Sequence, residues 1–295
     1  MGNFLENNIS TNMVDKFDSV RDFKFMDAFS VQEAIGLCFN DIYIPEEILF
    51  KILSFLEPKL LLKYSQVCKK WCNVIKSDIF WKDMFRLNSD ENPGNFPWYV
   101  YYCYLTTKNF NNLLKNGNGA KEFKHWKIKH NGGDKIDIEK PPIGSKPLPD
   151  EPEFVKDKSC FVTSYQKGSK YQEIDITNKR LLRFIINKFK FPVYVSEWTA
   201  GRFDCSSVYY LATRLESGED ESGLVGHESG TKEVRLIDID RVEWRKVELI
   251  FTKYPDNLVK IIFQHAGRDG QFWSGHYGAK MSGGVVKFLL HPKEI

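Results

Sequence analysis

The chain has 295 residues, of which 42% are hydrophobic and 27% are charged, and its formal net charge is +3. This length predicts two modest domains, each with enough apolar residues for a core. The basic residues are densest around Lys69 and Lys121, where aromatic and acidic residues interrupt them. Composition therefore argues against a nucleic-acid partner.

The six cysteines are sparse and lie in apolar surroundings, which favours buried free thiols over a disulfide framework. They are Cys38, Cys68, Cys72, Cys103, Cys160 and Cys205. The sequence shows no N-terminal signal segment and no apolar run long enough to cross a membrane. These features predict a cytoplasmic protein without membrane insertion.

Four segments follow one another along the chain. The first is polar with scattered aromatic residues, and we expect a weakly ordered arm with a short helix near residues 31–37. The second has helical periodicity, the third begins with a polar break and continues as a helix, and the fourth has short runs of period two. The expected boundaries are 1–39 for the arm, 40–87 for the helical domain, 88–111 for the linker and 112–291 for the β domain.

The helical segment opens with a proline and two acidic residues, which suit the first turn of a helix. Behind Pro45, apolar residues recur at three- and four-residue steps from Ile48 to Leu56 and make one apolar face. Pro58 ends this helix and opens a second amphipathic run, and a short third helix carries Trp81. We therefore expect three helices before the linker helix.

Beyond residue 116 the sequence has turn clusters, a proline-rich loop over residues 141–152, and short runs of alternating apolar residues. Runs such as 193–195, 247–251 and 259–263 are bounded by Gly, Asp, Asn or Pro. Several short strands with regular turns predict an antiparallel sandwich or barrel. The predicted fold class is therefore α+β and multidomain, with an all-α N-terminal domain and a C-terminal antiparallel β-sandwich.

The helical segment resembles an F-box in its proline-acid opening, its leucine-rich first helix, the run Val67-Cys68-Lys69-Lys70-Trp71 and the late Trp81. The resemblance implies a small three-helix motif that docks on the Skp-type adaptor of a cullin-RING ubiquitin ligase. So short a unit buries little apolar surface alone, so its leucines either meet the adaptor or form only an internal core. The residues expected to contact the adaptor are Ile44, Pro45, Ile48, Leu49, Ile52, Leu53, Leu56 and Trp71.

The C-terminal part resembles the F-box-associated domain of the sugar-recognising F-box proteins over most of residues 110–290. The shared motifs, in order, are Asn112-Leu113-Leu114-Lys115-Asn116, His130-Asn131-Gly132-Gly133-Asp134, and the runs 195–205, 263–269 and 272–280. The resemblance implies a ten-stranded antiparallel sandwich that recognises substrates for the ligase. Family members best known for sugar binding recognise the chitobiose core of high-mannose N-glycans, and thereby mark misfolded glycoproteins from the endoplasmic reticulum for ubiquitination and degradation.

Such members bind the glycan with two loops at one end of the sandwich. The resemblance places Tyr165 in one loop and the aromatic pair Phe272 and Trp273 in the other, where rings can stack on a pyranose. Ser274 stands where the family has a lysine, which removes a cationic donor. Asp204 matches an acid that can accept hydrogen bonds from sugar hydroxyls. The sandwich is therefore interpreted as glycan-binding, or as a polypeptide-binding domain that has lost sugar binding.

Each of these site residues also has a structural interpretation. Trp273 could lie in the core, Tyr165 could face the other sheet, and Asp204 could cap its own backbone. Cys68 and Cys72 have a metal-like spacing, but no second pair or nearby histidine completes a site.

No motif indicates catalysis, since the sequence has no phosphate-binding loop, zinc-protease helix or nucleophile elbow. We expect a non-catalytic ubiquitin-ligase adaptor without metal or cofactor. Its expected partners are the Skp-type adaptor, through it a cullin, and a glycoprotein or other protein substrate.

Overall fold

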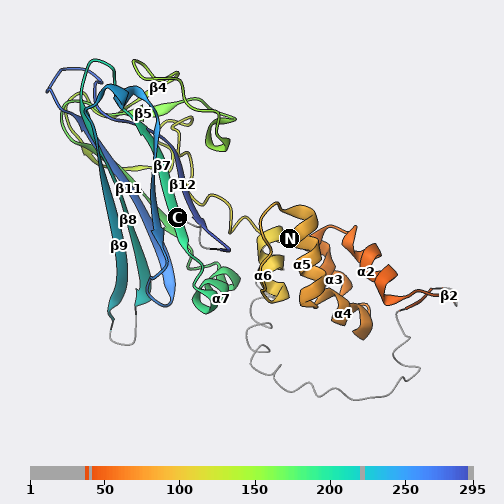
Figure 1. Cartoon of the computed structure of the whole chain (residues 1–295). Coiled ribbons are helices and arrows are strands. Elements are labelled where there is room, and N and C mark those ends of the chain that lie inside the picture. The colour runs from red at the N-terminus through yellow and green to blue at the C-terminus, as the bar shows by residue number, and fades with distance from the viewer. Residues whose placement is uncertain (1–36, 40–41, 220–222, 292–295) are drawn as a thin grey trace. The chain divides into compact units, whose positions relative to one another are not determined.

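The computed structural model describes residues 37–39, 42–219 and 223–291. The expected arm over residues 1–39, with its short helix, lies outside the described residues except for its last three. The chain divides into two compact units, Met1–Lys108 with Arg180–Leu182, and Asn109–Lys179 with Arg183–Ile295. Figure 1 labels their elements. In the described part of the chain, no helix is long and apolar enough to cross a membrane.

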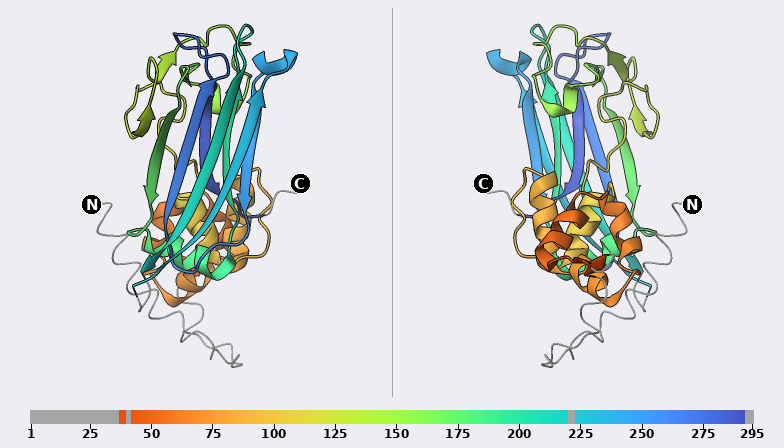
Figure 2. Two further views of the ribbon diagram at one scale, coloured as in Figure 1. Left: turned by 90° about the vertical axis from the view of Figure 1, so that its left-hand side faces the viewer. Right: turned by 90° about the vertical axis from the view of Figure 1, so that its right-hand side faces the viewer.

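The first unit is helical. After a short hairpin of β1 (Cys38–Phe39) and β2 (Ile42–Tyr43), five helices follow in its described part. They are α2 (Glu46–Ser54), α3 (Pro58–Tyr64), α4 (Lys69–Ile75), α5 (Asp78–Asn88) and α6 (Trp98–Thr106). Figure 2 shows them in orange and yellow, packed together as one bundle.

The second amphipathic run forms two helices, α3 and α4, where the sequence predicted one. Cys68 separates them, because its backbone is extended and its Sγ accepts a hydrogen bond from the Trp71 N–H at 3.5 Å. A residue with this conformation and this bond starts a new helix as its N-cap. The Val-Cys-x-x-Trp pattern therefore has a local structural function.

The core of the helical unit is aromatic. Trp81 is fully buried, and its indole N–H donates to the Ile75 carbonyl at 2.5 Å. Its ring also meets Tyr102 edge to face, with 5.4 Å between centroids. Helix α6 corresponds to the expected linker helix. It belongs to this core, since its residues Trp98–Cys103 are all buried.

The second unit is a sandwich of two five-stranded antiparallel sheets, as the resemblance implied. Their strand orders are β10-β7-β12-β5-β4 and β3-β6-β11-β8-β9. The strands of the first sheet are β4 (Asp137–Glu139), β5 (Cys160–Val162), β7 (Val193–Ala200), β10 (Arg245–Phe251) and β12 (Lys280–Phe288). Those of the second are β3 (Lys127–Asn131), β6 (Gly168–Asp175), β8 (Ser207–Glu219), β9 (Val225–Leu236) and β11 (Leu258–Asp269). Helix α7 (Arg180–Phe189) joins β6 to β7.

The strand register brings three loops to one end of the sandwich. Lys280, at the start of β12, lies opposite both Ala200 at the end of β7 and Val162 at the end of β5. In the other sheet, Asp269 at the end of β11 lies opposite Ser207 at the start of β8. The β5–β6, β7–β8 and β11–β12 loops are therefore neighbours.

A buried polar network joins the two sheets. Glu197 of β7 accepts hydrogen bonds from the Tyr209 hydroxyl of β8 and from His265 Nδ1 of β11, both at 2.6 Å. Lys170 of β6 bonds the other ring nitrogen of His265 and lies 4.0 Å from the centre of the Trp126 ring. These groups are almost fully buried. Burial without partners would destabilise each of them, so the network couples the sheets.

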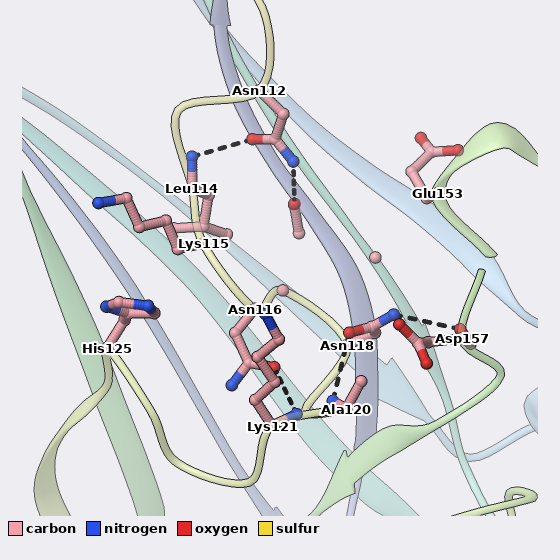
Figure 3. Close-up of a pocket in the computed structure, with 13 residues that line it drawn as sticks. Asn112, Leu114, Lys115, Asn116, Asn118, Ala120, Lys121, His125, Glu153 and Asp157 are labelled. Atoms are coloured by element: carbon pink, nitrogen blue, oxygen red, sulfur yellow. Dashed lines mark hydrogen bonds between the residues drawn. The ribbon is translucent and has the colours of Figure 1, made fainter. Parts of the chain in front are cut away.

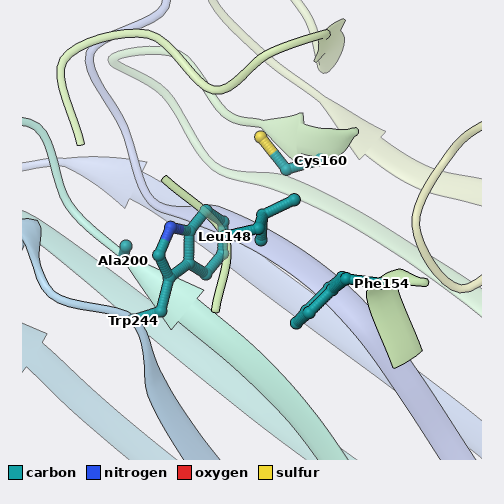
Figure 4. Packing of buried hydrophobic residues seen from close by; sticks show 5 residues of the cluster. All are labelled: Leu148, Phe154, Cys160, Ala200 and Trp244. Carbon is teal, nitrogen blue, oxygen red and sulfur yellow. The ribbon is translucent and has the colours of Figure 1, made fainter. Parts of the chain in front are cut away.

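A separate apolar cluster anchors the proline-rich loop. Leu148 of this loop and Phe154 just after it pack against Cys160 of β5, Ala200 of β7 and Trp244 before β10, as Figure 4 shows. The Trp244 indole N–H also donates to the Lys146 carbonyl at 2.8 Å. The loop is thus held against the sheet next to the loop end of the sandwich.

The buried network predicts acid sensitivity. Burial lowers the pKa of His265 from 6.5 to about 4 and also lowers that of Lys170, although Glu197 opposes both shifts. The unfolded chain therefore binds more protons than the folded chain between about pH 4 and 6.5, and stability rises with pH there. We expect the His265 contribution to lower the free energy of unfolding by about 3 kcal/mol between pH 7 and pH 4.

Urea unfolding of the protein at several pH values measures this slope. The variant His265→Gln keeps a donor and an acceptor but does not titrate, so its slope between pH 4.5 and 7 should be shallower. Equal slopes for the two proteins would show that His265 does not carry the effect.

The division into two units predicts that the sandwich folds alone. A fragment beginning near Asn112 omits the helical unit but keeps all ten strands. We expect it to be soluble, with a β-type circular dichroism spectrum and a cooperative unfolding transition. A mainly helical or unfolded fragment would contradict the prediction.

Candidate functional site

The predicted glycan-binding residues come from the three loops at the same end of the sandwich. Tyr165 lies in the β5–β6 loop and Asp204 in the β7–β8 loop. Phe272, Trp273 and Ser274 lie in the β11–β12 loop. Hydrogen bonds connect these loops, since the Asp269 N–H donates to the Ser164 carbonyl at 3.0 Å and the Gly270 N–H to the Ser206 carbonyl at 2.7 Å. The structure thus gathers all five residues at one end.

Asp269 shapes the loop that carries the aromatic pair. Its fully buried carboxylate accepts hydrogen bonds from the backbone N–H groups of Gln271, Phe272 and Trp273, at 3.1, 2.7 and 3.1 Å. These bonds hold Phe272 at a φ of +59°, which is uncommon for a bulky residue. Sequence reasoning missed the part that Asp269 plays in holding the candidate site, although an aspartate followed by Gly270 is a turn signal.

The loop presents aromatic rings to solvent. Phe272 is 65% exposed and Trp273 is 43% exposed. Phe272 faces the half-buried Tyr165 across 6.4 Å between ring centroids, and Trp273 meets Tyr277 edge to face at 5.6 Å. A core position for Trp273 is thereby excluded. We name Tyr165, Phe272 and Trp273 the aromatic clamp.

Ser274 is bound by a neighbouring acid. Its hydroxyl donates to the Asp134 carboxylate at 3.2 Å, and the Gly275 N–H donates to the same oxygen. The Asp134 N–H in turn donates to the Ser164 hydroxyl at 3.0 Å. Asp134 thus ties the turn before β4 to the loop of the aromatic clamp.

Asp204 is paired within its own loop. Its carboxylate lies 2.8 Å from Arg202 Nε, and the pair is largely buried. The Arg202 guanidinium also lies 4.5 Å from the centre of the Tyr277 ring. Arg241 holds the same loop by donating to the carbonyls of Arg202 and Phe203. Asp204 therefore borders the aromatic clamp through Arg202 and Tyr277.

A pocket of about 580 Å³ opens beside Ser274. Ser274, Arg202 and Tyr277 line it together with Lys140 and Glu139, whose carboxylate lies 2.6 Å from Lys280 Nζ. This volume is in the range of small-ligand sites. Its donors and acceptors next to exposed rings suit a polyhydroxylated ligand.

The predicted adaptor-binding residues divide between surface and core. Ile48 and Ile52 are 48% and 46% exposed, and Pro45 is exposed, while Ile44, Leu56 and Trp71 are partly buried. Leu49 and Leu53 are fully buried in the core of their own unit. We therefore replace their expected adaptor contact with a core role, because a buried side chain has no surface to offer.

Sequence reasoning missed two residues of this surface. Phe55 is 81% exposed and Val67 is 62% exposed. Phe55 follows Ile48 and Ile52 at helical spacing, so these three make one exposed apolar stripe on α2. Apolar patches of this kind mark interaction surfaces.

The cysteines are free in the described structure. Cys68 and Cys72 are partly buried, and Cys103, Cys160 and Cys205 are buried. The side chain of Cys38 lies outside the described residues. Among the described residues, no cluster of three histidine, cysteine or acidic side chains is arranged to hold a metal ion.

Comparison with known proteins matches both units. A family model described as "F-box associated region" matches residues 104–288, and one described as "F-box-like" matches residues 42–87. F-box only protein 6 of Bos taurus is 30% identical to the chain, with 82% of this chain and 91% of the relative covered. F-box only protein 17 of Homo sapiens is 26% identical, with 84% and 92% covered.

Among solved structures, the xylan-binding domain CBM22-1 of Paenibacillus barcinonensis Xyn10C shows a TM-score of 0.35 at 8% identity, covering 63% of this chain and 100% of that domain. A similarity of this size carries no argument about this chain. The two family models and the relatives agree with the two folded units and with the motifs that distinguish them. The chain therefore belongs to the family of F-box proteins that carry an F-box-associated domain.

Proposed function

We propose that this chain is the substrate-recognition subunit of a cullin-RING ubiquitin ligase, and that its sandwich binds the chitobiose core of N-linked high-mannose glycans. Its clients are misfolded glycoproteins, which it holds for ubiquitination and degradation. The observation that carries the proposal is the aromatic clamp, in which Asp269 holds Phe272 and Trp273 exposed beside Tyr165. Exposed rings held by a buried carboxylate are preorganised for stacking.

The clamp fits the two kinds of surface that a sugar offers. The C–H face of a pyranose is apolar and stacks on Trp273 and Phe272, while its hydroxyls need donors and acceptors at the rim. Around the clamp, Ser274 and Asp134 supply an acceptor and a carboxylate, and Arg202 lines the adjoining pocket. We assign the stacking to the rings and the orientation of the sugar to these polar groups.

The helical unit supplies the attachment to the ligase. The stripe of Ile48, Ile52 and Phe55 fits the apolar surface of a Skp-type adaptor, because exposed apolar side chains gain free energy when a partner removes them from water. The adaptor then links the chain to the cullin. In this proposal the chain presents its client in the cytoplasm and catalyses no step itself.

A second candidate is a ligase adaptor whose sandwich binds a polypeptide and no sugar. Two contacts favour it. The Ser274 hydroxyl already donates to Asp134, and the Asp204 carboxylate is already paired with Arg202. A sugar must compete with both, and the family lysine at position 274 is absent. Titration with chitobiose separates the two candidates.

The adaptor prediction uses the exposed stripe. Changing Ile48 and Ile52 to Glu places two charges in the expected interface, and desolvating an unpaired charge is unfavourable. We expect the double variant to lose co-purification with the Skp-type adaptor while its thermal unfolding stays within a few degrees of the parent protein.

The matched control is Lys76→Glu, which changes an exposed position at the end of α4, outside α2 and the stripe, and should retain the adaptor. Retention of the adaptor by the folded Ile48→Glu, Ile52→Glu variant would refute the assigned surface. Changes at Leu49 or Leu53 are unsuitable for this test, because they would destabilise the core.

The glycan prediction concerns the largest ring. Stacking contributes about 1 kcal/mol beyond area burial, so Trp273→Ala should weaken chitobiose binding several-fold and more than Asp204→Asn. Ser274→Lys should strengthen it, because a charged donor makes the stronger hydrogen bond. Calorimetry or NMR shift perturbation with the full chain measures each affinity.

Phe272→Ala should also weaken chitobiose binding, and Phe55→Ala is its matched control. Phe55 is an exposed ring like Phe272, but it lies in the helical unit and outside the sandwich. Its removal should leave chitobiose binding unchanged. If the parent protein does not bind chitobiose and Ser274→Lys gains nothing, the polypeptide-binding candidate replaces the glycan-binding one.

A further inference from the structure

Strand β3 forms one edge of the sheet β3-β6-β11-β8-β9. Its residues Lys127–Asn131 are all exposed, and β6 is the only described strand that pairs with it. The backbone groups along its outer edge are therefore available to an extended segment of another chain. No residue of β3 belongs to the aromatic clamp, although the turn after β3 carries Asp134.

Five lysines gather along β3 and the loop before it. We name Lys115, Lys121, Lys124, Lys127 and Lys129 the basic strip. All five are exposed, and Lys127 pairs with Glu173. Among the described residues, the other four ammonium groups have no hydrogen-bond or ion-pair partner. The strip therefore has unneutralised positive charge at the sheet edge.

Three lysines of the basic strip lie close enough to one histidine to affect its pKa. His125 lies between the loop and β3, and its pKa is lowered by desolvation and then by the charges of Lys115, Lys124 and Lys121. The sequence alone showed these lysines interrupted by Glu122, Phe123 and Trp126. The fold buries Trp126, while Glu122 stays exposed beside the lysines.

A pocket of about 450 Å³ adjoins the strip. Lys115, Lys121 and His125 line it together with Asn116 and Asn118. Figure 3 shows Lys115 and His125 on one side of this pocket, with Glu153 and Asp157 across from them. Those two acids are engaged elsewhere, Glu153 with Lys246 and Asp157 with Lys140. The pocket therefore continues the positive surface beyond the end of β3.

We propose that the basic strip and the outer edge of β3 bind an acidic polypeptide segment in extended conformation. The backbone of the segment pairs with β3, and its carboxylates meet the lysines of the strip. This interaction is independent of glycan binding, because none of its residues belongs to the aromatic clamp. It provides a second contact for a protein partner.

The open strand edge favours a polypeptide over a nucleic acid or a membrane. An open strand edge offers alternating N–H and C=O groups, which pair with a polypeptide backbone and with neither of the others. Lysines on an edge strand also discourage unwanted strand pairing. That role does not require lysines in the preceding loop or a pocket beyond the strand, whereas an acidic segment would contact both.

The test uses the full chain and a fluorescent octapeptide of alternating glutamate and threonine, with a lysine-threonine octapeptide as the control probe. Binding is measured by anisotropy at low ionic strength. Lys124→Glu with Lys129→Glu should weaken binding of the acidic peptide about tenfold. The control is Lys232→Glu with Lys253→Glu, which changes the net charge equally at exposed sites away from the strip. This double variant should change the affinity for the acidic peptide less than twofold.

Two further measurements distinguish backbone pairing with β3 from purely electrostatic attraction between the peptide and the lysines. N-methylation of alternate peptide residues removes the N–H groups on one edge, so one of the two methylated peptides should lose binding and the other should retain it. The NMR-measured pKa of His125 should rise on binding, because the added carboxylates favour the imidazolium.

The proposal is overturned if the acidic peptide binds no better than the lysine-threonine peptide, or if both double variants behave alike. Equal binding of both methylated peptides overturns the strand pairing. Tighter binding of oligothymidine or of phosphatidylserine vesicles than of the acidic peptide overturns the choice of a polypeptide. None of these results bears on chitobiose binding, so the two proposals fail separately.

Discussion

The sandwich depends on a carboxylate that is buried between its sheets. Glu197 of β7 is bound by Tyr209 and His265 of the opposite sheet. An unpaired carboxylate in this position would destabilise the fold strongly, so the two sheets must pack with β7 and β11 placing Glu197 against His265. The same strand, β11, ends four residues later at Asp269, whose carboxylate builds the exposed loop. The contact of Glu197 with His265 in the core therefore helps to fix the end of β11, from which the loop of the aromatic clamp starts.

The clamp shows how a binding loop can be rigid without being buried. The side chains of Phe272 and Trp273 are exposed, but their backbone N–H groups are bound to a fully buried acid. Asp134 performs a similar function for Ser274 and Gly275. The side chains that a ligand meets are therefore supported by carboxylates that it does not need to touch. Such support reduces the ordering that binding would otherwise require.

Substitutions within the family have consequences beyond the substituted residue. With serine at position 274, the Asp134 carboxylate bonds the loop itself, and no lysine ammonium stands between the loop and a ligand. The Arg202 and Asp204 pair is likewise satisfied within its own loop. The polar groups of the site are therefore already bound to other groups of the protein, whereas the aromatic rings are exposed. In the proposed glycan complex, stacking on the exposed rings therefore contributes more than the polar groups do.

The sequence by itself determined the helical and antiparallel classes and the family to which both parts belong, because periodicity and ordered motifs are local properties of the chain. Only the tertiary structure decided which apolar stripe of α2 faces inward. Leu49 and Leu53 are buried whereas Ile48 and Ile52 remain exposed, and both pairs have the same helical spacing. The contacts of Asp269, Asp134 and the basic strip also came from the fold, because they join residues that strand pairing and loop packing bring together. A sequence pattern shows which residues share a face of a helix or strand. Packing in the folded protein decides which face is covered and by which other element.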